Sequence, residues 1–99
     1  MAGKVAILLL LVVSLAAMAS PHQAKLGCRD FEKARILHDC REFIRPEGRY
    51  IIPTRNGNCC WAVRVVPGLD MPCIITLLTP VERKQNSESK ILGLRNVCM

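Results

Sequence analysis

The 99-residue chain has room for one domain, carries a net charge of +6 and contains six cysteines. Its four aromatic residues accompany no nucleic-acid recognition motif, so the positive charge does not indicate a nucleic-acid partner. No glycine-rich phosphate loop is present, and no arrangement of residues predicts an enzyme or a cofactor site.

The first 19 residues have the pattern of an export signal. Lys4 supplies a positive start, residues 5–17 are apolar apart from Ser14, and residues 17–19 match the small-x-small cleavage pattern. A membrane-spanning helix needs about 20 apolar residues, which is longer than this run. We therefore expect residues 1–19 to be cleaved. A secreted, extracellular protein would remain, with a loose arm over residues 20–27 and a single domain over residues 28–99.

All six cysteines lie in the part that remains after cleavage. An even cysteine count in a short exported chain indicates a disulfide framework, and each bond typically adds roughly 2–4 kcal/mol to a domain whose core is small. On a helix, the consecutive side chains of Cys59 and Cys60 point about 100° apart, so we expect these two to bond to different partners. Spacing alone leaves most of the other pairings open.

The first predicted helix covers residues 29–45. Acidic residues in its first turns and Arg41 and Arg45 in its last suit the helix dipole. Pro46 and Gly48 stop it. Its apolar face is formed at helical spacing by Ile36, Leu37, Cys40, Phe43 and Ile44.

A long loop follows over residues 46–58, where proline, glycine and asparagine break any regular structure. Residues 49–52 have the composition of a strand but no partner strand. We therefore expect them to form an extended segment lying over the core.

The second half of the chain predicts short helices with clear start signals. Asn58 caps a helix over residues 59–66, and Asp70 caps the next, which tolerates Pro72 in its first turn. Residues 79–82 form a capping box that begins a single helical turn, and Ser87 caps the last helix. The predicted fold is all-α: a compact bundle of four short helices with a long loop, cross-linked by three disulfides.

Four stretches carry a resemblance to a known superfamily. They are residues 28–43 with two cysteines, Asn-Cys-Cys-Trp-Ala-Val-Arg-Val-Val at 58–66, Asp-Met-Pro-Cys-Ile-Ile-Thr-Leu-Leu-Thr at 70–79, and residues 90–98. Together they resemble the plant eight-cysteine helical superfamily of non-specific lipid transfer proteins, bifunctional protease/α-amylase inhibitors and seed storage proteins. Type-2-like lipid transfer proteins are the most similar group.

Two family cysteines are absent here. Ile75 stands where the family has its sixth cysteine, and the chain ends at Met99 before an eighth. In type-2-like lipid transfer proteins these two cysteines pair with each other. The resemblance therefore implies that three bonds are kept, Cys28–Cys73, Cys40–Cys59 and Cys60–Cys98. It also implies that the C-terminal arm that closes one end of the lipid tunnel is missing.

The resemblance implies a monomeric, non-catalytic lipid-binding or lipid-transfer protein that holds a fatty acid or lysolipid-like ligand between its helices. Burial of each methylene of an acyl chain contributes about 0.8 kcal/mol. The arginines at 41, 45, 49 and 55 are candidates for transient contact with a membrane surface. The candidate lining residues are Leu37, Ile44, Tyr50, Ile52, Val63, Val66, Ile74, Leu78, Ile91 and Leu94.

Alternatives remain open at this point. The loop with Arg49 or Arg55 as anchor fits a protease or α-amylase inhibitor, and the six-cysteine order also resembles the prolamin-like signalling proteins secreted by plant egg cells. A degenerate copy with little function is a fourth reading. Trp61 fits either a partner surface or packing against the first helix. A zinc site from Cys59, Cys60 and His38 is disfavoured because no C-x2-C pair occurs.

Overall fold

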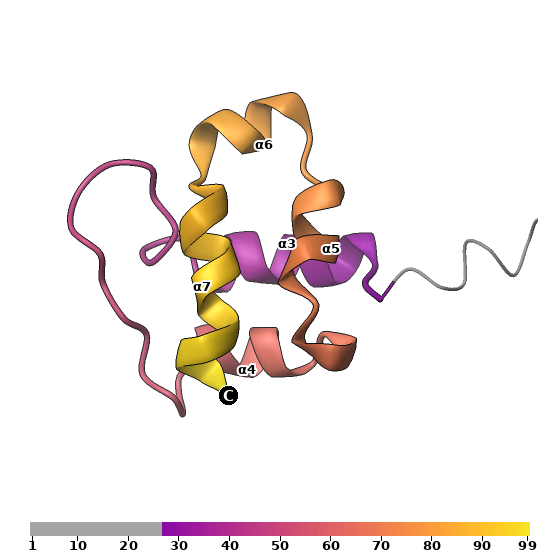
Figure 1. The fold of residues 1–99 in the computed structure, drawn as a ribbon, viewed down its shortest axis with the longest axis vertical. Coiled ribbons are helices and arrows are strands. Elements are labelled where there is room, and N and C mark those ends of the chain that lie inside the picture. Colours follow the sequence, from indigo (N-terminus) through magenta and orange to yellow (C-terminus); the bar gives the residue numbers. More distant parts are fainter. Residues whose placement is uncertain (1–26) are drawn as a thin grey trace, which may run out of the picture.

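The computed structural model describes residues 27–99, which contain α-helices and one 3-10 turn but no β-strand (Figure 1). The predicted signal peptide and all but the last residue of the predicted arm lie outside this range. The described residues are all-α, as predicted, but they form five α-helices where four were expected. None of these helices has the length and apolar character that crossing a membrane requires.

Helix α3 (Asp30–Asp39) is shorter than predicted. At its start, the buried carboxylate of Glu32 accepts the backbone N–H of Arg29 at 2.7 Å. The expectation that the helix continues to Arg45 is wrong. Beyond Asp39, the N–H of Phe43 bonds to the carbonyl of Cys40 at 2.8 Å in a tight turn, which directs the fully buried Ile44 into the core. Tertiary packing therefore ends the helix before Pro46 does.

Helix α4 (Asn58–Arg64) is followed by the 3-10 turn η1 (Pro67–Leu69). Asn58 is the first helical residue and not the cap; Gly57 occupies the cap position without a side-chain hydrogen bond. Gly68 has a φ of +66°, a left-handed conformation that glycine adopts without steric cost. Helix α4 ends at Arg64, two residues before the predicted end at Val66, and Pro67 and Gly68 form part of η1.

Helices α5 (Met71–Thr76) and α7 (Glu88–Cys98) begin at the predicted caps. A carboxylate oxygen of Asp70 accepts the N–H of Cys73 at 3.0 Å, and the hydroxyl of Ser87 accepts the N–H of Lys90 at 3.2 Å. Each cap satisfies a backbone donor that the first turn of a helix leaves free, which is why short polar residues mark these starts in the sequence.

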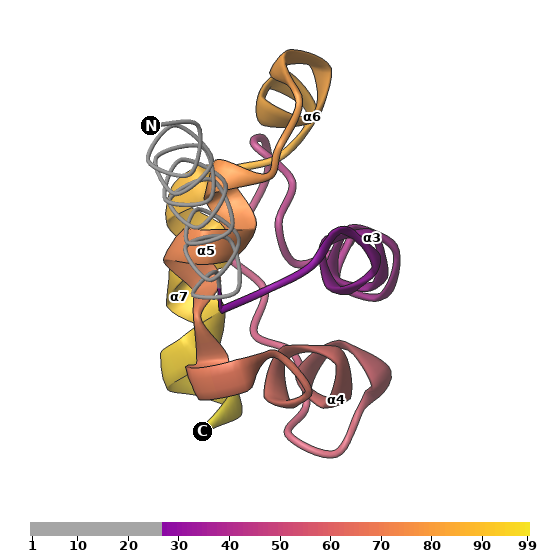
Figure 2. The same cartoon turned by 90° about the vertical axis from the view of Figure 1, so that its right-hand side faces the viewer.

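Helix α6 (Pro80–Gln85) is the additional helix, longer than the single turn expected. It buries no side chain and stands at one end of the bundle, with α4 at the other (Figures 1 and 2). The capping box between Thr79 and Glu82 starts it, and an ion pair of 2.9 Å joins Glu82 to Lys33 of α3. The backbone hydrogen bond from Thr79, followed by the bond from Lys33, lowers the pKa of Glu82 below its ordinary value of 4.5.

Three disulfides connect the packed helices, and they are the pairs that the resemblance implied. Cys28–Cys73 links the start of α3 to α5, Cys40–Cys59 links the end of α3 to α4, and Cys60–Cys98 links α4 to α7. All six cysteines are buried in the same core as the large aliphatic side chains. Burial of apolar surface stabilises this core, and the disulfides add stability by restricting the unfolded chain. Both contributions therefore act in the same small part of the molecule.

Candidate functional site

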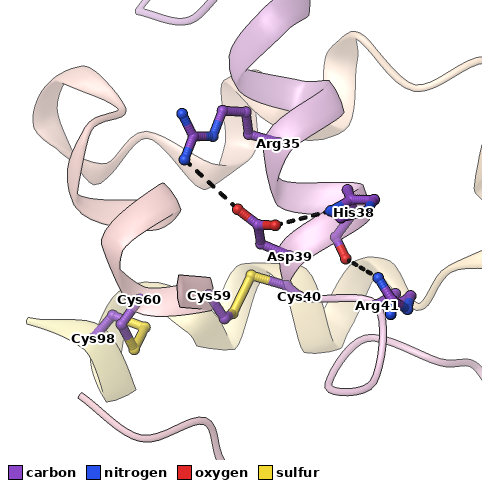
Figure 3. The surroundings of a disulfide bond; sticks show 8 residues. All are labelled: Arg35, His38, Asp39, Cys40, Arg41, Cys59, Cys60 and Cys98. Atoms are coloured by element: carbon purple, nitrogen blue, oxygen red, sulfur yellow. Dashed lines mark hydrogen bonds and ion pairs between the residues drawn. A yellow bond between two sulfur atoms is a disulfide. The ribbon is translucent and has the colours of Figure 1, made fainter. Parts of the chain in front are cut away.

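The long loop over residues 41–57 is the most exposed part of the described chain and the candidate binding site. It arches outward on the side of α7 that faces away from α5 (Figure 1). The Cys40–Cys59 disulfide, with Cα atoms 4.6 Å apart, closes its base. Figure 3 shows this bond beside the end of α3, where Arg35 lies 3.8 Å and His38 2.9 Å from the carboxylate of Asp39.

Hydrogen bonds hold the loop only near its two ends. At the first end, the carbonyl of Ile44 accepts the N–H of Ser87 at 2.7 Å, and the Lys90 ammonium donates to the carbonyl of Arg45 at 2.7 Å. At the second end, Arg64 donates to the carbonyl of Arg55 at 2.8 Å. From 46 to 53, this described segment makes no hydrogen bond to a helix. The hydrogen bonds at the base of the loop therefore do not extend to its middle.

Residues 45–52 of the loop are all exposed, which contradicts the expectation that residues 49–52 lie over the core. Tyr50, Ile51 and Ile52 are 53%, 50% and 62% exposed. The sequence pattern identified these side chains as apolar but could not show that the helices fill their own core without them. The buried Pro53 and the contact of the Tyr50 hydroxyl with Gly93 connect this stretch to the bundle.

Tyr50 rests against α7 at Gly93. A Cβ atom placed on Gly93 would lie 3.0 Å from the tyrosine hydroxyl oxygen, closer than ordinary van der Waals contact. Glycine weakens a helix by its backbone freedom, but the lack of a side chain at Gly93 makes room for the loop. The sequence alone gave no signal of this pairing.

The candidate lining residues divide into two groups. Tyr50 and Ile52 are exposed on the loop, whereas Leu37 is half-buried against the core and Leu78 is buried within it. The remaining six are almost completely buried and belong to one core cluster: Ile44, Val63, Val66, Ile74, Ile91 and Leu94.

This core is closed in the structure. Ile44, Val63 and Ile74 have no surface that a water-sized sphere could touch, so no acyl chain fits beside them in this conformation. Nearby, Tyr50 contacts α7 at Gly93, and Lys90 of α7 donates to the carbonyl of Arg45 at the first end of the loop. We call the contact between Tyr50 and Gly93 the seam.

Three hollows lie on the surface of the described residues. The largest of them, about 270 Å³, is formed within the loop and its approach by Glu42, Arg45, Glu47, Gly48, Arg49 and Ile51. Gly48 has a φ of +89°, and this left-handed bend lets the chain fold around the hollow. Two others, of about 250 and 230 Å³, lie at the end of α3 and beside η1. None of the three is lined by any of the ten candidate residues.

A second exposed face joins α3 and α4. The guanidinium of Arg35 stacks 4.7 Å from the ring centre of Trp61, which is 51% exposed. Both readings of Trp61 thus hold in part, because the ring packs against the first helix and keeps half of its surface free. Phe31, one turn before Arg35, is also exposed. No local pattern in the sequence marks Arg35, because its partner Trp61 is distant in the chain.

Two of the three zinc ligands considered from the sequence, Cys59 and Cys60, are not available to a metal. The sulfurs of Cys59 and Cys60 form disulfides, and a disulfide sulfur is not the thiolate that binds a metal. Within residues 27–99, no three side chains of the metal-binding types come together.

Comparisons with known proteins add no relative. No family model matches the chain, and neither a curated protein nor a solved structure is significantly similar to it.

Proposed function

We propose that this protein is a secreted, non-catalytic lipid-binding protein of the lipid-transfer type, which takes one acyl chain between the long loop and α7. The observation that carries the proposal is the seam at Tyr50 and Gly93. There, the half-exposed Tyr50 lies against α7, and the exposed Ile51 and Ile52 follow it without a hydrogen bond to a helix.

Outward movement of the loop opens this seam. The residues between Pro46 and Pro53 lose no hydrogen bond to a helix when they move, and the Cys40–Cys59 bond keeps the loop ends in place. An acyl chain then replaces water along Tyr50, Ile52 and the face of α7 at Gly93. At about 0.8 kcal/mol for each buried methylene, about ten methylenes give a dissociation constant of about 1 μM.

A fluorescent fatty acid titrated into the oxidised mature chain tests this proposal. We expect saturable uptake at micromolar concentration. Gly93→Leu fills the seam and lowers affinity about tenfold, because about two methylene contacts are lost. Arg95→Leu adds the same side chain to an exposed position of α7 next to η1 and serves as the matched control.

The two possible failures of this experiment have different meanings. Absence of saturable uptake overturns the lipid-binding function. Uptake that Gly93→Leu leaves unchanged, in a variant that still folds, overturns the seam as the site.

Inhibition of a digestive protease or amylase is the second candidate function, favoured by the disulfide that closes the base of the exposed loop. Arg49 is the anchor in this alternative, since its guanidinium makes no hydrogen bond or ion pair with the other described residues. Arg55, by contrast, donates to the Met99 backbone oxygen. Trypsin-like enzymes and amylases that keep full activity in excess protein contradict this reading. A signalling role like that of prolamin-like proteins predicts expression restricted to reproductive cells.

A further inference from the structure

The exposed loop combines apolar and basic side chains in one short stretch. Tyr50, Ile51 and Ile52 follow directly after Arg49, and the bend at Gly48 brings Arg45, Arg49 and Ile51 around the same hollow. We call the five residues Arg45, Arg49, Tyr50, Ile51 and Ile52 the loop face.

The loop face keeps a net positive charge within the described part of the chain, although Glu42 and Glu47 line the same hollow as Arg45 and Arg49. Ion pairs occur at Lys33–Glu82, Arg35–Asp39, His38–Asp39 and Arg83–Glu88, all on α3, α6 or α7. Arg45 and Arg49 form none with the other residues of the range 27–99. Glu42 and Glu47 lie on the same loop, but four arginines between positions 41 and 55 outnumber them. The loop is therefore a cationic segment with an apolar centre.

We propose that the loop face docks on the surface of an anionic lipid bilayer. Arginines near such a surface are attracted by its negative potential, and apolar side chains between them enter the boundary between headgroups and acyl chains. Tyrosine favours the same boundary because its ring is apolar and its hydroxyl is polar.

A bilayer fits this face better than a folded protein does. Energetically important residues in protein interfaces sit in well-packed, rigid settings, whereas the centre of this loop has no hydrogen bond to a helix. A fluid surface needs no fixed shape from its partner. The Trp61–Arg35 face lies on helices α3 and α4 and not on the loop.

Docking extends the proposed function because it names the bilayer as the source of the acyl ligand. In that one respect it rests on the proposed function. Insertion of Ile51 and Ile52 would draw the loop away from α7 and open the seam at Gly93 where the lipid is available.

Co-sedimentation of the oxidised mature chain with vesicles tests the docking. The vesicles consist either of phosphatidylcholine alone or of three parts phosphatidylcholine to one part phosphatidylserine. We expect binding to the anionic vesicles that added salt weakens, and little binding to the neutral ones. Removing one basic residue from the contact is expected to weaken binding about fivefold.

Two charge-matched variants locate the contact. Arg45→Gln with Arg49→Gln removes two charges from the loop face and is expected to weaken binding about 25-fold. Lys84→Gln with Arg95→Gln removes two charges from exposed positions on α6 and α7 and is expected to have little effect. Ile52→Gln lowers binding further, whereas Val81→Gln, on a side chain equally exposed at 61%, does not.

Several outcomes overturn the docking proposal. They are no vesicle binding, equal binding to neutral vesicles, or an equal loss in both charge variants, which would show that net charge alone attracts the protein. Vesicle binding without fatty-acid uptake leaves the docking standing and removes the carrier function. Fatty-acid uptake without vesicle binding removes the docking and leaves the carrier function standing. If the loop face captures a protease and the protein binds no vesicles, the face is assigned to a protein partner.

Discussion

The bundle of α3, α4, α5 and α7 and the loop over residues 41–57 are both built from apolar and charged residues, but they differ in how these are held. In the bundle, aliphatic side chains and all six cysteines share one buried core. In the loop, residues 45–52 are exposed, and hydrogen bonds occur only near the ends. The Cys40–Cys59 bond joins the two regions.

This difference shows that a small domain can draw its stability from one region, here the bundle, and leave the side chains of another region exposed to solvent. Covalent links and core packing act together in the bundle and at Ile44, so the exposed residues 45–52 of the loop contribute little to folding. Side chains such as Ile52 are then available for a ligand or surface. A change in the bundle should therefore lower stability strongly, and a change in the loop should not.

The largest effect is expected from removing Cys60–Cys98 with the double substitution Cys60→Ala and Cys98→Ala. The two cysteines are 38 positions apart, a loop whose closure in the unfolded chain corresponds to about 4 kcal/mol of stability. Chemical denaturation of the oxidised protein measures the loss. A loss below about 1 kcal/mol would show that α4 and α7 are held by packing alone.

Smaller effects are expected when isoleucine is replaced by alanine once in the bundle and once in the loop. This pair of variants tests the comparison directly. Ile74→Ala removes a fully buried side chain and should cost about 3 kcal/mol, since a cavity remains. Ile52→Ala, on an exposed loop side chain, should change the free energy of unfolding by less than about 0.5 kcal/mol. Equal losses at both positions would mean that the loop packs against the core after all.

Helix α6 provides the smallest effect, because it is held by polar contacts alone. Its Glu82 accepts the Thr79 N–H at 2.8 Å and pairs with Lys33. We expect Glu82→Gln to cost less than about 1 kcal/mol at neutral pH, because glutamine keeps an acceptor for the Thr79 N–H and only the charge facing Lys33 is lost. Chemical denaturation across a pH series measures this cost.

The pH dependence of this cost has a defined sign. Because folding lowers the pKa of Glu82, the ionised carboxylate stabilises the fold above its ordinary pKa of 4.5, and this contribution is lost as the pH falls through the lower folded value. The difference between wild type and variant should therefore shrink in acid. Glu47→Gln, on an exposed loop residue without an ion pair in the described range, is the control and should show no such trend. A difference that stays constant with pH would rule out the charge of Glu82 as its cause.

The sequence predicted the helix starts well and the helix ends less well. Asp70, Thr79 and Ser87 act within one turn of their own position, so local chemistry is enough to identify them. The end of α3 at Asp39 depends on the burial of Ile44 and on its bond to Ser87, which is 43 positions away. No local pattern carries that information.

The candidate site divides in the same way. The sequence shows that Tyr50, Ile52 and Ile74 are apolar, but it does not show which of them are buried together. Ile51 was not among the candidates although it is half-exposed beside Arg49. The contact of Tyr50 with Gly93 required the loop and α7 to be placed in space.

By itself, the sequence determined an all-helical chain with an even set of cysteines and the residues that begin its helices, because these depend on composition and on contacts within a turn. The tertiary structure alone decided that the helices fill their own core and that the loop remains outside it. Side-chain volume is shared among residues far apart in the chain, so whether space is left for a ligand is a property of the packed whole.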